Sequence, residues 1–114
     1  MVLEIAELFI RPGTQDEFDQ AIRQGVETVI AKSPGFRGFE IQRGIESAER
    51  YVLLIEWDSL ESHTVDFRGS ESFARWRAIV SPFFAKPPHV EHFHRVAGTR
   101  VSNYGSAGET RFSR

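Results

Sequence analysis

Cysteine is absent from this chain of 114 residues, and so are long apolar runs and a strong excess of one charge. Without cysteine, disulfide bonds, thiolate catalysis and cysteine-based metal sites are excluded. No apolar stretch is long enough to span a bilayer. The formal net charge of −2, with acids and bases interspersed, disfavours nucleic acid binding. The sequence begins without the pattern of a secretion signal, so we expect a cytoplasmic location.

Aromatic residues, by contrast, are numerous, with ten phenylalanines and two tryptophans. Hydrophobic residues make up 40% of the chain and charged residues 26%, which is an ordinary globular balance for a single domain. The aromatic rings can fill a core, line a pocket for a flat ligand, or cover a subunit interface.

Four segments have the alternation or the residue types of β-strands, and two regions between them have helical spacing. The strands are expected at residues 2–10, 36–43, 51–57 and 89–96. The first helix is expected to start at a Thr14–Glu17 capping box, and the second helical region at an Asp58–Glu61 box. Gly25, within the apolar stripe of the first helix, is expected to pack closely against the sheet.

The order of these elements is βαββαβ, which predicts an α+β, ferredoxin-like fold: a four-stranded antiparallel sheet with helices on one face. The strands are apolar on both sides. The helices cover one side, and a large bare apolar surface marks an interaction site. We therefore expect a homodimer in which the sheets of two copies face each other.

The chain is divided into a domain at residues 1–97 and a tail at residues 98–114, which is rich in glycine, serine, threonine and arginine. By composition alone the tail is typical of disorder. We hypothesise that it lies as an arm on the partner subunit, anchored by Val101, Tyr104 and Phe112.

Several short stretches resemble the antibiotic biosynthesis monooxygenase (ABM) domain family. They are Phe36 to Arg43, the run Tyr51-Val-Leu-Leu-Ile-Glu-Trp57, Ser59 to His63, Ser70-Glu-Ser-Phe73, and Ile10-Arg11-Pro12-Gly13 before the first helix. The resemblance covers about Val2 to Val96. It implies a dimeric α/β barrel with a pocket in each subunit between sheet and helices. It also implies kinship with cofactor-independent oxygenases of polyphenols, anthrones and quinols. The haem-degrading branch has an asparagine in its first strand where Ala6 or Glu7 stands here, which disfavours haem degradation.

His63 and His92 are the candidate catalytic residues. His63 lies on the inward stripe of the second helical region, between Leu60 and Phe67, and a neutral imidazole there can take a phenolic proton. The alternative is a buried histidine that only satisfies the fold. On the fourth strand, His92 and His94 share a face with Val90. That pair lacks a clear third ligand, so we expect no metal.

The candidate substrate-binding residues are aromatic, with core packing as the alternative for each of them. They are Trp57, Phe67, Phe73, Trp76 and Phe83. Arg75 and Arg77 are interpreted as solvated surface residues. Glu7 is interpreted as an edge or interface residue paired with an arginine, or alternatively as a pocket acid.

Together these features predict a cofactor-independent monooxygenase of a small electron-rich aromatic compound, such as a quinol or polyphenol. We expect no cofactor, no nucleic acid or membrane partner, and a second copy of the chain as partner. The alternative is a non-catalytic ligand-binding or stress-related dimer of the same fold. A third possibility is an isomerase that consumes no oxygen.

Overall fold

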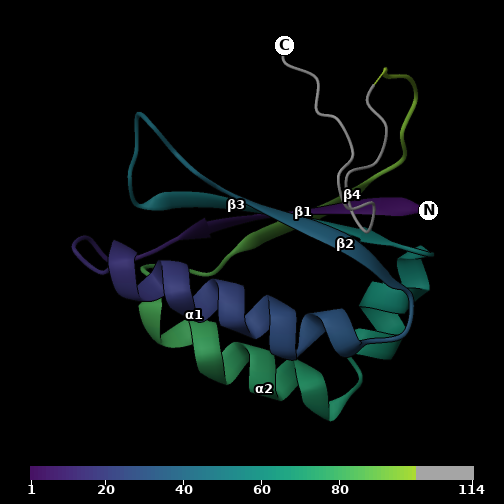
Figure 1. Cartoon of the computed structure of the whole chain (residues 1–114), viewed down its shortest axis with the longest axis horizontal. Coiled ribbons are helices and arrows are strands. Elements are labelled where there is room, and N and C mark those ends of the chain that lie inside the picture. The colour runs from purple at the N-terminus through teal and green to yellow at the C-terminus, as the bar shows by residue number, and fades with distance from the viewer. Residues whose placement is uncertain (100–114) are drawn as a thin grey trace.

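The computed structural model describes residues 1–99 and has a four-stranded antiparallel sheet with its helices on one face (Figure 1). The elements follow the order βαββαβ, so the predicted ferredoxin-like fold class is confirmed. The strands are β1 (Val2–Phe9), β2 (Phe36–Arg43), β3 (Arg50–Trp57) and β4 (His89–Phe93). The helices are α1 (Gln15–Thr28) and α2 (Glu71–Val80), with short helical segments η1 (Ile30–Lys32), η2 (Ser62–Phe67) and η3 (Ser81–Phe83).

The strand order is β2-β3-β1-β4, which places the first strand at the centre of the sheet and the last strand at an edge. β1 is antiparallel to both of its neighbours, and Glu4 lies opposite Ile55 of β3 on one side and His92 of β4 on the other. β4 ends at Phe93, three residues before the predicted end at Val96. The sheet thus brings residues from both ends of the described chain together.

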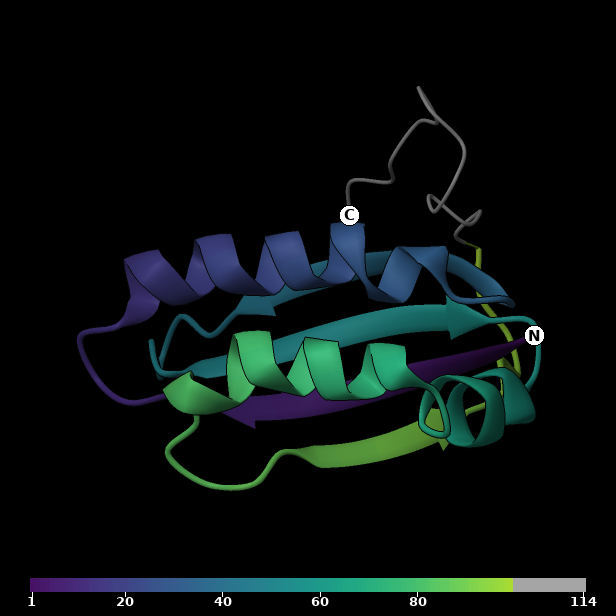
Figure 2. The same cartoon turned by 90° about the horizontal axis from the view of Figure 1, so that it is seen from below.

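The two faces of the sheet differ in burial. α1 and α2 lie side by side over one face (Figure 2), where they cover alternate residues of β1 and β3. On the opposite face the side chains are only half-buried, among them Leu3, Ile5 and Leu54. The covered face holds the core, whose largest fully buried side chains are Trp57, Tyr51, Phe18 and Phe67.

Gly25 allows a close approach between the two helices, not between α1 and the sheet as predicted. A Cβ placed on Gly25 would lie 2.9 Å from two ring carbons of Trp76 on α2. Contacts this short do not occur between real side chains, so the Trp76 ring occupies space that any larger residue at this position would need.

Neither predicted capping box forms. The Thr14 hydroxyl donates to the carbonyl of Arg11 at 2.7 Å and makes no cap to α1. At the second site, the Ser59 hydroxyl accepts from the Ser62 amide at 3.2 Å, while Asp58 pairs with Arg37 at 3.0 Å. Hydroxyl and carboxylate groups have several backbone and side-chain partners in reach at a chain turn, and sequence spacing alone does not choose among them.

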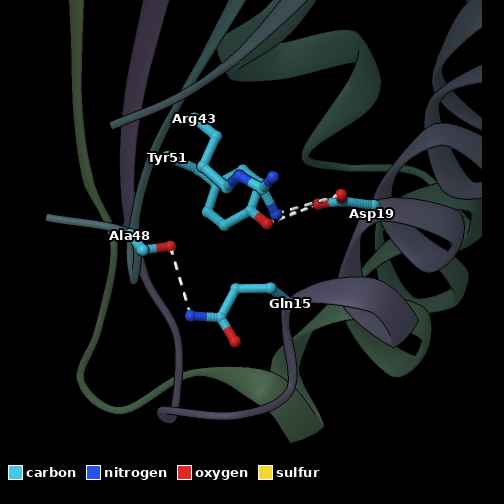
Figure 3. A network of polar contacts seen from close by, with 5 residues as sticks. All are labelled: Gln15, Asp19, Arg43, Ala48 and Tyr51. Carbon is cyan, nitrogen blue, oxygen red and sulfur yellow. Dashed lines mark hydrogen bonds and ion pairs between the residues drawn. The ribbon is translucent and has the colours of Figure 1, made fainter. Parts of the chain in front are cut away.

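Polar contacts connect the first turns of α1 to the β2–β3 hairpin (Figure 3). The Tyr51 hydroxyl donates to Asp19, and Arg43 lies 3.3 Å from the same carboxylate. Burial, followed by the hydrogen bond to Asp19, raises the pKa of Tyr51 to about 12, so this phenol stays protonated. Gln15 donates to the Ala48 carbonyl at 3.5 Å.

The predicted arm falls outside the described residues, since Val101, Tyr104 and Phe112 all lie beyond residue 99. Among residues 1–99, no helix has the length and apolarity needed to cross a bilayer.

Candidate functional site

A cavity of about 290 Å³ lies on the helix-covered side of the sheet. Most of its wall is apolar and comes from the sheet, from α2 and from the segments that flank α2. Four polar side chains also face it: Glu4, His63, Arg68 and Arg77. The apolar lining residues are Ala6, Leu8, Ile30, Leu53, Phe67, Phe73, Trp76, Val80, Phe84, Pro88 and Val90.

Glu4 places a carboxyl group on the buried face of β1. It is 5% exposed, and one of its oxygens, Oε1, accepts a hydrogen bond from Trp57 Nε1 at 2.9 Å. Burial raises its pKa from 4.5 to about 7, although the Trp57 hydrogen bond and the positive charge of Arg68 lower it in part. The carboxyl group therefore gains and loses its proton close to neutral pH.

His63 lies next to this carboxyl group and is 4% exposed. Its ring stacks on Trp57, with ring centroids 5.3 Å apart and an interplanar angle of 13°, and its Nε2 is 3.5 Å from Glu4 Oε1. Burial, then the charges of Arg68 and His92, lower its pKa to about 3. Since His63 stays neutral and Glu4 holds its proton up to about pH 7, the two are not a preformed ion pair.

His92 completes the cluster from the edge strand β4. Its Nε2 lies 2.8 Å from His63 Nδ1, within hydrogen-bond distance. The side chain is half-buried and is not among the residues that line the cavity. Burial, then Arg68, lowers its pKa as well. The structure thus brings together the two histidines that the sequence analysis selected and adds Glu4 to them.

The segment that carries His63 is a π-helix, η2, wider than an α-helix. The predicted α-helical stripe placed Leu60, His63 and Phe67 on one face. In the structure His63 and Phe67 are buried, but Leu60 is 40% exposed. The wider turn changes which residues share a face, and π-helical turns occur frequently at functional sites.

Three of the five predicted substrate-binding residues line the cavity, and two do not. Phe67, Phe73 and Trp76 line the cavity, as expected for a pocket wall. Trp57 lies behind His63 and reaches the site through its indole nitrogen. Phe83 packs on Phe18 with ring centroids 5.4 Å apart, and it is the next residue, Phe84, that lines the cavity.

Arg77, interpreted from the sequence as a solvated surface residue, and Glu7, interpreted as an edge or interface residue, have specific positions. Arg77 lines the cavity, with its guanidinium carbon 6.0 Å from the centre of the Phe73 ring. Glu7 forms an ion pair with Arg50, so the predicted pairing with an arginine is confirmed, but β1 has a neighbouring strand on each side, so the prediction of an edge position is wrong. Within residues 1–99, no three histidine, aspartate or glutamate side chains converge as metal ligands would, and His94 is exposed.

Sequence reasoning missed Glu4 and Arg68. For Glu4 a signal was present: it alternates with Val2, Ala6 and Leu8, so it shares their face. Arg68 follows η2 directly and lines the cavity, and no pattern in the sequence singled it out.

The fold and the cavity define a small ferredoxin-like domain that has a mostly apolar pocket with a protic group at its wall. The sequence model of the antibiotic biosynthesis monooxygenase family matches residues 1–79, and the chain belongs to this family. An uncharacterised protein of Bacillus subtilis strain 168, YczJ, is 38% identical over 96 residues, which are 84% of this chain and all of that protein.

Solved structures agree with this assignment. A Bordetella bronchiseptica protein provisionally assigned as an antibiotic biosynthesis monooxygenase is 34% identical, with a TM-score of 0.79. The match covers 84% of this chain and 97% of that one. A Nitrosomonas europaea protein with the same provisional assignment has a TM-score of 0.71 at 19% identity, covering 86% and 92% of the two chains, and shows likeness of fold alone.

Proposed function

We propose that this protein is a cofactor-independent monooxygenase acting on a small electron-rich aromatic compound, such as a quinol or polyphenol. The observation that carries the proposal is the position of Glu4 and His63 in the wall of a cavity that is otherwise mostly apolar and aromatic. A cavity of about 290 Å³ suits a small ring compound. Membership of the monooxygenase family supports the same reaction class.

The first step is removal of a phenolic proton by the Glu4–His63 pair. His63 alone is a weak base because its pKa is about 3, whereas Glu4 titrates at about 7, near the optimum for proton transfer at neutral pH. The positive charge of Arg68 lowers the pKa of both residues and favours the substrate anion in the same way.

The substrate anion then reduces molecular oxygen. Per turnover, one oxygen atom enters the substrate as a carbonyl and the other leaves as water, and the substrate supplies all four electrons and both hydrogens. The aromatic wall holds the ring: Phe67 and Phe73 meet edge to face, with centroids 5.6 Å apart, and Trp76 adds a further ring.

Oxygen uptake with a panel of quinols tests this proposal. His63→Ala should lower kcat/KM by about a hundredfold or more, because it removes one member of the Glu4–His63 pair that takes the phenolic proton. His94→Ala, at an exposed histidine, is the matched control and should be unaffected. Labelled oxygen gas should leave one labelled atom in the product. Equal rates for the wild type and His63→Ala would remove this residue from the reaction, and a product without label would contradict a monooxygenase.

We also propose that the open face of the sheet is covered by a second copy of the chain. The half-buried side chains Leu3, Ile5 and Leu54 give this face an apolar centre. Sedimentation velocity at micromolar concentration should show a dimer, and Leu54→Arg should shift it to monomer. Gln24→Arg, on the exposed side of α1, should leave the dimer intact. A wild-type monomer would contradict this proposal.

A further inference from the structure

Three titratable side chains from three elements form a continuous line: Glu4 from β1, His63 from η2 and His92 from β4. We propose that they act as a proton relay between the cavity and solvent at the sheet edge, in which both histidine rings change tautomer together. The use of this relay in turnover rests on the proposed function, but its existence does not.

The two ends of the line have different surroundings. Glu4 and His63 line the cavity and are buried. His92 is half-buried on an edge strand, outside the cavity lining. Glu4 and His92 are also direct cross-strand partners on the covered face, so the sheet itself fixes their separation. A proton released in the cavity thus has a path of side chains that leads outward.

The contact between the rings limits their protonation. Nδ1 of His63 and Nε2 of His92 are 2.8 Å apart, so one of these atoms carries the hydrogen and the other accepts it. Both rings are neutral at neutral pH because burial lowers both pKa values. Each neutral ring has one N–H, so the direction of this hydrogen bond determines whether His63 Nε2, beside Glu4, carries a hydrogen.

Two arrangements follow. When Glu4 is protonated, its hydroxyl faces a bare His63 Nε2, His63 donates from Nδ1 to His92 Nε2, and His92 has its hydrogen on Nδ1. To release a proton, Glu4 transfers its hydrogen to His63 Nε2, the hydrogen on Nδ1 of His63 moves to His92 Nε2, and His92 loses its Nδ1 hydrogen to water. Glu4 is then a carboxylate, both rings are neutral with hydrogen on Nε2, and one proton has left.

The groups around the line suit this transfer. The indole of Trp57 donates to Glu4 Oε1 from β3 and stabilises the carboxylate. Arg68, after η2, and Arg77, on α2, face the same cavity, and the charge of Arg68 disfavours a lasting cation on either ring. The 3.5 Å between Glu4 and His63 exceeds a hydrogen bond by about half an ångström, a gap that enzyme sites commonly shorten when ligand binds.

The decisive experiment is nitrogen NMR of the histidine rings in the wild-type protein, with carbon NMR of the Glu4 carboxyl group, across pH 5 to 9. We expect Glu4 to lose its proton near pH 7. Both rings should move their hydrogen from Nδ1 to Nε2 with the same midpoint. Tautomers that stay fixed while Glu4 titrates would overturn the relay.

A variant pair tests its use. His92→Phe should lower kcat by about a hundredfold, with KM little changed, and imidazole in the buffer should restore part of the rate. His89→Phe, exposed on the same strand, is the matched control. A loss that imidazole does not restore would overturn the relay's part in turnover. A lack of oxygen uptake with every quinol would instead remove the proposed function, while the NMR result would still decide whether the relay exists.

Discussion

Glu4 and Glu7 are two carboxylates on the same strand, and the sheet separates them. Glu4 lies on the face covered by helices, where it is buried beside Trp57 and His63. Glu7 lies on the opposite face, where its partner is the guanidinium of a half-exposed Arg50. Since successive side chains of a strand point to opposite faces, an odd spacing places one acid in the core and the other on the surface. The same functional group thereby serves proton chemistry in one place and an ordinary ion pair in the other.

The largest difference between the two acids should appear in stability. When folding raises the pKa of an acid, the contribution of that acid to the free energy of unfolding is fully present below the pKa that it has in the unfolded chain. This contribution is lost as the pH rises through the pKa that it has in the folded protein. For Glu4 the window is pH 4.5 to about 7. Glu4→Gln cannot ionise, so it should raise the free energy of unfolding by about 3 kcal/mol at pH 9 and by little at pH 4. Urea unfolding at both pH values measures this.

Urea unfolding of the same variants below pH 6.5 tests the assignment of His63. Folding lowers the pKa of His63, so its contribution to the free energy of unfolding is fully present above pH 6.5 and is lost as the pH falls toward about 3. In the wild type the opposite trend of Glu4 offsets this loss between pH 6.5 and 4.5. Glu4→Gln removes the offset and should lose stability steadily over that range, whereas Glu7→Gln should follow the wild type. If Glu4→Gln raised the free energy of unfolding by the same amount at pH 4 and at pH 9, Glu4 would not be the titrating group.

A smaller effect is expected at Trp57. Trp57→Phe removes the only N–H of the indole and with it the hydrogen bond that favours the Glu4 carboxylate. The pKa of Glu4 should rise above about 7, and the protein should be destabilised by about 2 kcal/mol at alkaline pH. Carbon NMR of the carboxyl group gives the first quantity and urea unfolding the second. Trp76→Phe, in the cavity wall, is the control. If the titration midpoint of Glu4 shifted equally in both variants, the Trp57 hydrogen bond would not be the cause of the shift.

The smallest effect is expected on the open face. In the Leu54→Arg monomer, replacing Glu7 by Gln or Arg50 by Met breaks an ion pair with substantial solvent exposure, which is worth less than about 1 kcal/mol. Unfolding at low and high salt measures it, and salt should reduce the difference. In the wild-type dimer the double-mutant coupling between Glu7 and Arg50 should be larger than in this monomer, and equal coupling in the two proteins would contradict a partner subunit over the open face.

The periodicities of the sequence predicted the fold well, because strands and amphipathic helices each bury one repeating set of residues. Alternation in β1 and β3 separated the two faces correctly, and short stretches such as Tyr51 to Trp57 and Ser59 to His63 carried the family resemblance. The site was less predictable. His63 and His92 were selected by residue type and face, but Glu4 was overlooked because only the apolar members of its face were considered.

The remaining differences come from local geometry that spacing does not encode. Leu60, two residues before η2, is 40% exposed, although an α-helical count places it inside. Phe83 ends the 3₁₀ segment η3, and it is the next residue, Phe84, that lines the cavity. Phe83 and Phe84 differ by a single position, which is enough to change which ring meets a ligand.

The contact between Gly25 and Trp76 has a consequence for ligand selection. One side of the Trp76 ring rests on the bare backbone of α1, and the ring also forms part of the chamber wall. A methyl group added at Gly25 would have to displace the indole, and the cavity is one direction in which the ring can move. Gly25 therefore helps to set which molecules the cavity accepts, although it is not a lining residue and α1 contributes no group to the proposed chemistry.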